Sequence, residues 1–233
     1  LTVRDETLET RGSLDGYIQP GQIALVDGVQ VNSRLTDRLF DVVTGQQRPL
    51  AGQVQIDGRP AAELAAARGR SSLVLLERDP AVFHGTLIEN MSGFGGLEQA
   101  DLAVEYAAAL GLAKRVNRLP FGYNSQLGIG DNFERDPVNR QLISLVRAFS
   151  LKPSILLMNE PTAILDQDER EALKSFIAGL EDRPTILMYS PDPRMKSLAN
   201  TSITATVEVD QTLQAFRTDA QSDGVSYAQK GAA

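Results

Sequence analysis

The sequence predicts an α/β fold built on a mainly parallel sheet. Short apolar runs alternate along the chain with longer amphipathic stretches, which is the order that strand and helix units produce when they follow one another. Gly and Asp-Gly punctuate the first half of the chain where turns are needed. With 233 residues, the chain is long enough to bury a substantial apolar core without disulfides.

The first half of the chain predicts three strands and one helix. The run 22–26 is typical of a buried strand, and 72–76 of another. Between them we expect a helix at 37–44, closed by Gly45, and an edge strand at 53–56 that turns at Asp57-Gly58.

The rest of the chain predicts three helices and two strands. An Ala-rich pattern indicates a helix over about 97–113, and Asp136-Pro137 opens a helix at 138–149, since Pro is favoured in a first turn. Strands are expected at 155–158 and 185–189, with an amphipathic helix at about 168–180 between them. The apolar pattern decays after Val209, so 221–233 is predicted to be a flexible polar tail.

Composition narrows the function classes. A net charge of −7 and a pI near 4.9 argue against binding to nucleic acid or to an anionic membrane surface. The absence of Cys excludes disulfides and thiolate metal ligands. No run approaches the roughly 20 apolar residues that span a bilayer, so neither a membrane anchor nor a signal peptide is expected. Because the chain opens on Leu1, we expect it to be part of a longer protein.

The most informative motif is the run 155–158 with the Asn159-Glu160-Pro161-Thr162 turn and Asp166 after it. An apolar strand that ends in a carboxylate and a tight turn presents acid groups to a bound nucleotide. This segment resembles the Walker B strand of ATP-binding cassette (ABC) ATPases. Similar blocks occur in the family's order at 21–26, 52–58, 83–90, 119–123 and 146–149, and those at 83–90 and 119–123 are typical of exporters. An accidental Glu-Pro-Thr in an unrelated α/β domain would not explain these blocks.

The resemblance implies a P-loop NTPase-like core with an antiparallel β subdomain and an inserted α-helical subdomain at about 90–150, within a domain of 1–220. It implies ATP and Mg²⁺ as cofactors. It also implies two partners, the transmembrane domain of an exporter and a second cassette, and a location at the cytoplasmic face of the membrane. The surface at 78–90 would meet the membrane domain.

The stretch that matches the family's phosphate-binding loop, 27–38, departs from the pattern. Glycine amides and a Lys normally hold the phosphates there, but this stretch has one Gly and the first Lys of the chain is Lys114. Thr36 or Ser33 is expected to cap the following helix, and Asp37 to place a carboxylate where phosphate would lie. The protein itself is therefore expected to fill the anion site.

The other matching positions also depart from the family, except Glu160, the general-base position, and Asp166. Asn159 replaces the Asp that orients magnesium, and Arg78 replaces a Gln that contacts it. The signature that clasps the partner's phosphate corresponds to 135–139, where Asp136 would repel phosphate and Pro137 has no N–H. Ser190 or Pro191 stands in place of the switch His, and no aromatic lies near 9–12 to stack on adenine.

These departures favour a degenerate nucleotide-binding domain that serves export as a structural or regulatory partner, with Glu160 vestigial and no metal ligand assigned. One alternative is a divergent but active ATPase, in which Arg34 or Arg38 replaces the Lys and Glu160 activates water. Arg34, Arg38 and Arg78 could then hold a phosphate. A further alternative is a soluble interaction module that uses the same fold.

Overall fold

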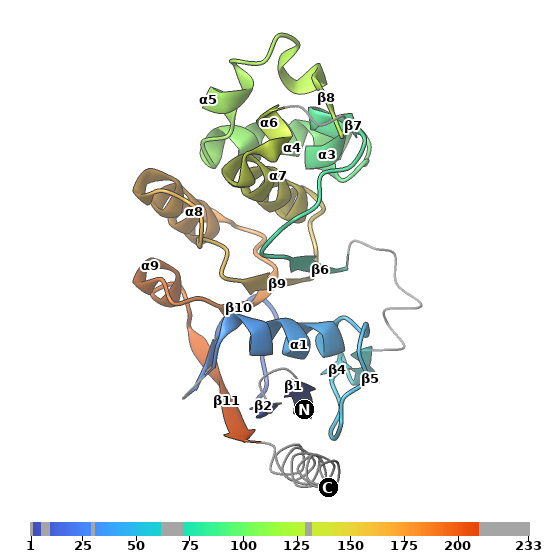
Figure 1. Ribbon diagram of the computed structural model, residues 1–233, viewed down its shortest axis with the longest axis vertical. Coiled ribbons are helices and arrows are strands. Elements are labelled where there is room, and N and C mark those ends of the chain that lie inside the picture. Colours follow the sequence, from blue (N-terminus) through green and yellow to red (C-terminus); the bar gives the residue numbers. More distant parts are fainter. Residues whose placement is uncertain (1, 6–9, 29–30, 62–71, 129–131, 210–233) are drawn as a thin grey trace, which may run out of the picture.

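The computed structural model describes residues 2–5, 10–28, 31–61, 72–128 and 132–209. Within these residues, seven strands form one sheet in the order β1-β2-β11-β3-β10-β9-β6 (Figure 1). The strands are β1 (Thr2–Asp5), β2 (Thr10–Asp15), β3 (Ile23–Asp27), β6 (Leu73–Leu76), β9 (Ile155–Asn159), β10 (Thr185–Tyr189) and β11 (Thr201–Val209).

The sheet is mainly parallel, as predicted. Neighbouring strands are parallel from β11 through β3, β10 and β9 to β6. At the other edge, β1 pairs antiparallel with β2, and β2 with β11. Two small antiparallel pairs lie outside this sheet, β4 (Gln55–Ile56) with β5 (Arg59–Pro60) and β7 (Gly85–Thr86) with β8 (Gln126–Leu127). The parallel strands therefore bring their carboxyl ends to one edge.

Each face of the sheet carries its own apolar core, because side chains alternate along a strand. In β3, Ala24 and Val26 face the core beneath α1 (Ser33–Val43), whereas Ile23 and Leu25 face the other core. That second core is completed by the remaining helices. The helices are α3 (Leu87–Ser92), α4 (Leu97–Ala109), α5 (Ala113–Val116), η1 (Gly122–Asn124), α6 (Asn132–Arg135), α7 (Pro137–Ser150), α8 (Gln167–Gly179) and α9 (Pro193–Lys196).

The helices α3 to α7 gather at one end of the molecule, at the top of Figure 1, where α7 packs against both α3 and α4. The limits predicted for a helical subdomain, about 90–150, and for the whole domain, 1–220, remain predictions. The predicted tail at 221–233 lies outside the described residues. Among those that are described, every helix is too short or too polar to cross a bilayer.

Helix boundaries differ from the predictions where a cap decides them. The helix predicted at 37–44 begins at Ser33, because the side chain of Asn32 accepts a hydrogen bond from the backbone N–H of Leu35 at 3.0 Å. The predicted caps were therefore wrong: Ser33 and Thr36 lie inside the helix, and the Thr36 hydroxyl donates back to the Asn32 carbonyl at 3.0 Å.

The helix predicted at 97–113 ends at Ala109, because Gly111 turns the chain with a φ of +83° before α5. The edge strand predicted at 53–56 is shortened to Gln55–Ile56, and Asp57 and Gly58 form the expected turn with positive φ angles. The remaining predicted helices and strands are confirmed to within one or two residues.

Candidate nucleotide-binding site

The candidate site lies at the carboxyl ends of the parallel strands, where ligands bind in open α/β sheets. β3 ends at Asp27 and leads through Gly28 to α1, β9 ends at Asn159, and Arg78 follows β6 by two residues. A Cβ at Gly28 would lie 1.9 Å from the Ala205 carbonyl oxygen, so this turn must pack directly on β11. Residues 29–30 of the predicted phosphate-binding loop lie outside the described residues.

Four residues at this edge of the sheet form one hydrogen-bonded group, which we call the Asp37 cluster: Ser33, Asp37, Arg78 and Asn159. The Arg78 guanidinium donates to the Asp37 Oδ2 at 2.8 Å and to the Ser33 hydroxyl at 3.2 Å. The buried Asn159 amide donates to the Ser33 carbonyl at 2.7 Å and to the Asp37 Oδ1. The cluster therefore joins the first turns of α1 to the ends of β6 and β9.

The donor set of the cluster does not match Mg²⁺, which requires several oxygen ligands and prefers carboxylates. Both oxygens of the Asp37 carboxylate already accept hydrogen bonds, and Asn159 turns its amide N–H groups toward them. The Asn159 Oδ1 is buried with no hydrogen-bond partner among the described residues, but it is a single neutral oxygen. The described residues contain no group of three or more side chains suited to a metal.

The structure does not bring Arg34 and Arg38 into the Asp37 cluster. Both side chains are exposed, and the Arg38 guanidinium lies 3.9 Å from the Asp41 carboxylate one turn further along α1. Burial raises the pKa of Asp41, although Arg38 acts in the opposite direction. For Arg34, the described part of the chain shows no hydrogen bond or ion pair. Of the three predicted phosphate-binding arginines, only Arg78 is in the cluster.

Glu160 follows Asn159 but is not a member of the cluster. Its backbone is left-handed, with φ +48°, and its N–H donates to the Tyr189 carbonyl at 2.8 Å. Burial, and then the charge of Glu160, raise the pKa of the Tyr189 hydroxyl, which donates to the Val31 carbonyl at 3.1 Å. A non-glycine residue in this conformation stores strain that is common at functional sites. Among the described residues, the Glu160 carboxylate has no hydrogen-bond partner.

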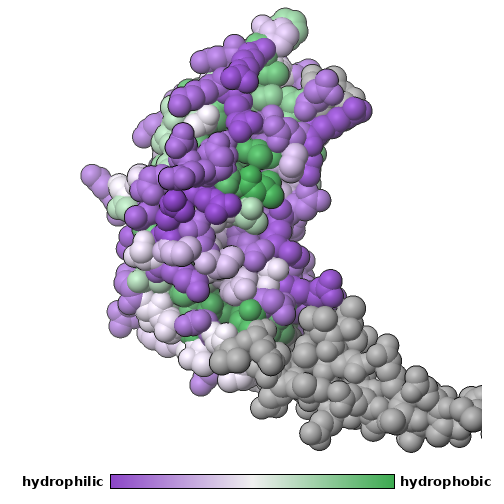
Figure 2. All heavy atoms as spheres, turned by 60° about the vertical axis from the view of Figure 1, so that its left-hand side comes forward, coloured by the Kyte–Doolittle hydropathy of each residue, from purple (hydrophilic) through white to green (hydrophobic). Residues whose placement is uncertain are grey.

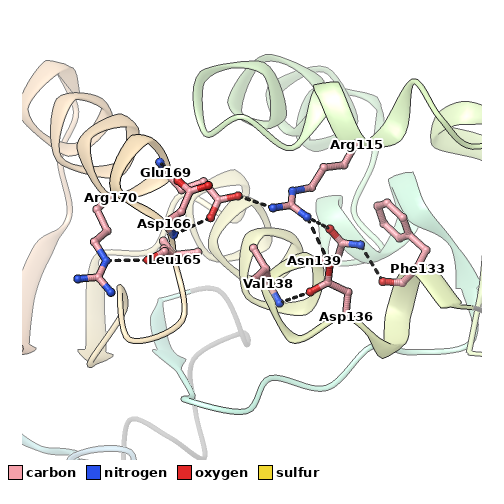
Figure 3. A network of polar contacts seen from close by, with 9 residues as sticks. All are labelled: Arg115, Phe133, Asp136, Val138, Asn139, Leu165, Asp166, Glu169 and Arg170. Atoms are coloured by element: carbon pink, nitrogen blue, oxygen red, sulfur yellow. Dashed lines mark hydrogen bonds and ion pairs between the residues drawn. The ribbon is translucent and has the colours of Figure 1, made fainter.

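Asp136 and Asp166 act first as helix caps (Figure 3). The Asp136 carboxylate accepts from the Val138 N–H at 2.8 Å at the start of α7. Asp166 caps α8 by accepting from the Glu169 N–H at 2.8 Å, and Glu169 accepts in return from the Asp166 N–H at 3.0 Å. The first free amide of α7 is therefore taken by the protein's own carboxylate.

Sequence reasoning missed Arg115, which connects these two helix starts. From α5, its guanidinium donates to Glu169 at 2.7 Å and to Asp136 and Asn139 at 3.3 Å each (Figure 3). A hollow of about 410 Å³ lies beside it between α4, α5 and α8. This side of the molecule is mostly hydrophilic (Figure 2). The signal that could have indicated the contact is the Asp-x-x-Glu capping box at 166–169, which leaves one carboxylate oxygen free for a cation.

A second group of contacts fixes the segment that follows Arg78. Asn90 accepts from the Phe83 N–H and donates to its carbonyl, both at 2.8 Å. The Arg147 guanidinium lies 4.8 Å from the centre of the Phe83 ring and donates to the Asn90 carbonyl at 2.7 Å. Burial lowers the pKa of Arg147 to about 10. Half of the Phe83 side chain nevertheless remains exposed.

Comparison with known proteins places this arrangement in a family. No protein-family model matches the chain. ABC transporter B family member 15 of Arabidopsis thaliana is 32% identical over 166 residues, which are 69% of this chain and 13% of that protein. The glutathione/L-cysteine transport system ATP-binding/permease protein CydC of Bacillus subtilis is 29% identical over 150 residues, 64% of this chain and 26% of that protein. The chain thus spans about a quarter or less of these relatives.

A bacterial Atm1-family ABC exporter solved with ATP bound has the same fold. It superposes with a TM-score of 0.65 over 92% of this chain and 38% of the exporter chain, at 17% sequence identity. The relatives, the ordered motif blocks and the sheet topology agree: the chain belongs to the ATP-binding cassette family, as a nucleotide-binding domain of the exporter type.

Proposed function

We propose that this domain is a degenerate cassette that does not bind Mg-ATP in the family's manner, does not hydrolyse it, and supports export as a structural or regulatory component. The observation that carries the proposal is the Asp37 cluster, in which residues at positions that resemble the family's magnesium and phosphate contacts are bonded to one another. No Lys precedes Lys114, so the loop before α1 cannot supply the usual cation. A transmembrane domain and a second cassette are the proposed partners, at the cytoplasmic face of a membrane.

The expected loss of ATP-binding free energy supports this proposal. A hydrogen bond to a charged group contributes about 1.5–3 kcal/mol. Losing the Lys, the magnesium carboxylate and several loop amides therefore costs roughly 4–8 kcal/mol. Each 1.4 kcal/mol is about tenfold in affinity, so a micromolar site would become millimolar or weaker.

The start of α7 supports the proposal for the second half of a composite site. Cassettes act in pairs, and each nucleotide lies between the phosphate loop of one cassette and the signature of the other. Here the Asp136 carboxylate occupies the Val138 N–H, and Pro137 has no N–H to offer. Pairing with an intact cassette would therefore leave both composite sites impaired.

The alternative function, a divergent ATPase, is favoured by one observation. The Glu160 carboxylate is unpaired among the described residues and sits on a strained backbone beside the site. In this alternative, Glu160 accepts a proton from the attacking water, and exposed Arg34 or Arg38 replaces the Lys.

The deciding experiment is a calorimetric titration of the 233-residue chain with Mg-ATP up to several millimolar, with an intact exporter cassette as positive control. We expect no binding heat from this chain. Micromolar binding would overturn the proposal and require a turnover assay, with Glu160→Gln as the matched variant. Turnover that Glu160→Gln abolishes would establish the divergent ATPase.

A further inference from the structure

We propose that the Arg78 guanidinium is a tethered cation that replaces a divalent metal ion in this domain. The inference rests on the proposed function, concerns the same site, and specifies the group that occupies the metal position. Arg78 contacts the Ser33 hydroxyl and the Asp37 carboxylate, two oxygen groups on the first turns of α1. Next to them, β9 ends at Asn159. Hydroxyl and carboxylate oxygens of this kind are what a hard cation would bind.

Both oxygens of the Asp37 carboxylate and both amide hydrogens of Asn159 already have partners inside the cluster, whereas the Asn159 Oδ1 has none among the described residues. The Asp37 carboxylate accepts from Arg78 at one oxygen and from Asn159 at the other. Asn159 uses its two amide hydrogens on the Ser33 carbonyl and on Asp37. A metal ion at Asp37 would compete with Arg78 and the buried amide for the carboxylate oxygens, and displacing either partner would leave a donor unpaired.

The charges of the cluster also match a monovalent cation. Asp37 carries one negative charge and Arg78 one positive charge, while Ser33 and Asn159 are neutral, so the cluster sums to zero. A carboxylate at position 159 would lie beside Asp37 and bring the negative charge to two, which a divalent ion would balance and a guanidinium would not. The amide at 159 and the cation at 78 are therefore matched to each other.

The tethered cation also fixes the segment that leads to the 78–90 surface. Arg78 is held by Asp37, Asp79 accepts from Arg140 of α7 at 2.7 Å, and the Ala81 carbonyl accepts from Arg147 at 3.1 Å. The segment is thus attached to α1 on one side and to α7 on the other by the protein's own groups.

The test measures Mn²⁺ binding, which is detected as a decrease in the electron paramagnetic resonance signal of free Mn²⁺. Four proteins are compared: wild type, Arg78→Gln, Arg78→Gln/Asn159→Asp, and Arg48→Gln, a matched control that removes an exposed arginine remote in sequence. We expect only weak surface binding by the wild type and the control. The double variant should bind one Mn²⁺ at least tenfold more tightly, and Mg²⁺ should compete for it.

Tight Mn²⁺ binding by the wild type that Asp37→Asn abolishes would overturn the inference, as would a double variant that binds no better than the wild type. If the double variant folds poorly without metal, the midpoint of its thermal unfolding should rise with Mn²⁺, and no rise would equally overturn it. Micromolar binding of ATP by the wild type, equal with and without Mg²⁺, would defeat the proposed function alone, because Arg78 would still occupy the metal position.

Discussion

Replacing Arg115 with Met tests whether one side chain holds the starts of α7 and α8 together. Met keeps most of the aliphatic stem and removes the guanidinium. The substitution deletes the contacts to Glu169 at 2.7 Å and to Asp136 and Asn139 at 3.3 Å. Glu169 keeps its bond from the Asp166 N–H, and Asp136 its bond from Val138, so neither carboxylate loses every partner.

The expected loss of folding stability follows from these contacts and from the exposure of their side chains. Three hydrogen bonds to charged or polar groups would be worth about 1–3 kcal/mol each if fully buried. The Arg115 side chain is 31% exposed and that of Asp136 39%, which discounts their contact, whereas Glu169 is only 11% exposed. We therefore expect a net loss of about 2–3 kcal/mol, or roughly 5–10 °C in Tm for a domain of this size.

The assay is urea unfolding of Arg115→Met beside Arg118→Met, a matched control for an exposed cation three residues away. A double-mutant cycle with Glu169→Gln should give a coupling energy of about 1 kcal/mol or more. A loss below about 0.5 kcal/mol for Arg115→Met, equal to that of the control, would refute the reasoning. So would a coupling energy of zero, because the pair would then contribute nothing specific.

Three further outcomes can be measured by unfolding and exchange. Gly28→Ala should cost about 2–5 kcal/mol, because its Cβ would meet a β11 carbonyl, whereas the control Gly179→Ala, in open space on α8, should gain up to about 1 kcal/mol; equal effects would contradict this. Hydrogen bonds from Thr86 lower the pKa of Glu89, so the stability that Glu89 contributes is present above its unfolded pKa and is lost as pH falls through its folded pKa. Glu89→Gln should therefore flatten the loss of stability from about pH 6 to about pH 3. An unchanged pH profile would refute this. Arg147→Lys should raise amide exchange in 81–90, since Lys cannot reproduce three guanidinium contacts, and unchanged protection would argue against that role.

The central strands could be predicted from sequence because their local pattern and their tertiary role agree. The runs at 155–158 and 185–189 are apolar on both faces, and both faces are in fact covered. The helix at 168–180 was found by its apolar spacing and is confirmed as α8. In such segments burial favours the conformation that the residues already prefer.

The outer strands β2 and β11 were not predicted, although only β2 lacks a strand pattern in its sequence. β2 has Leu14 as its one large apolar residue among Thr, Arg, Ser and Asp, whereas β11 alternates apolar residues at 203, 205, 207 and 209 with Ser, Thr and Glu. Their pairing is long-range: β11 joins β2 near the start of the chain and β3 on its other side. The start of α1 was missed for a different reason: Ser33 or Thr36 was expected to cap the helix, but Asn32, which is an equally favourable residue type, does so.

The individual site residues were identified, but their contacts were not. Asp37 was expected to supply a carboxylate and Arg78 to lie where the family has Gln, yet 41 positions separate them and no local rule predicts their ion pair. Asn159 was identified only as an uncharged residue at the position where the family has an Asp. Only the fold shows that its amide hydrogens point at Asp37 and the α1 backbone.

The departures at 78 and 159 make physical sense as a pair. Arg78 beside an Asp at 159 would leave the cluster with one uncompensated negative charge, and Gln at 78 beside Asn159 would leave Asp37 without its cation. Either single change would place a poorly balanced carboxylate in a cluster that includes a side chain only 1% exposed. The observed combination satisfies both oxygens of Asp37 and sums to zero charge. If the proposals above hold, this balance is what allows the cluster to hold the ends of β6 and β9 against α1 in place of a ligand.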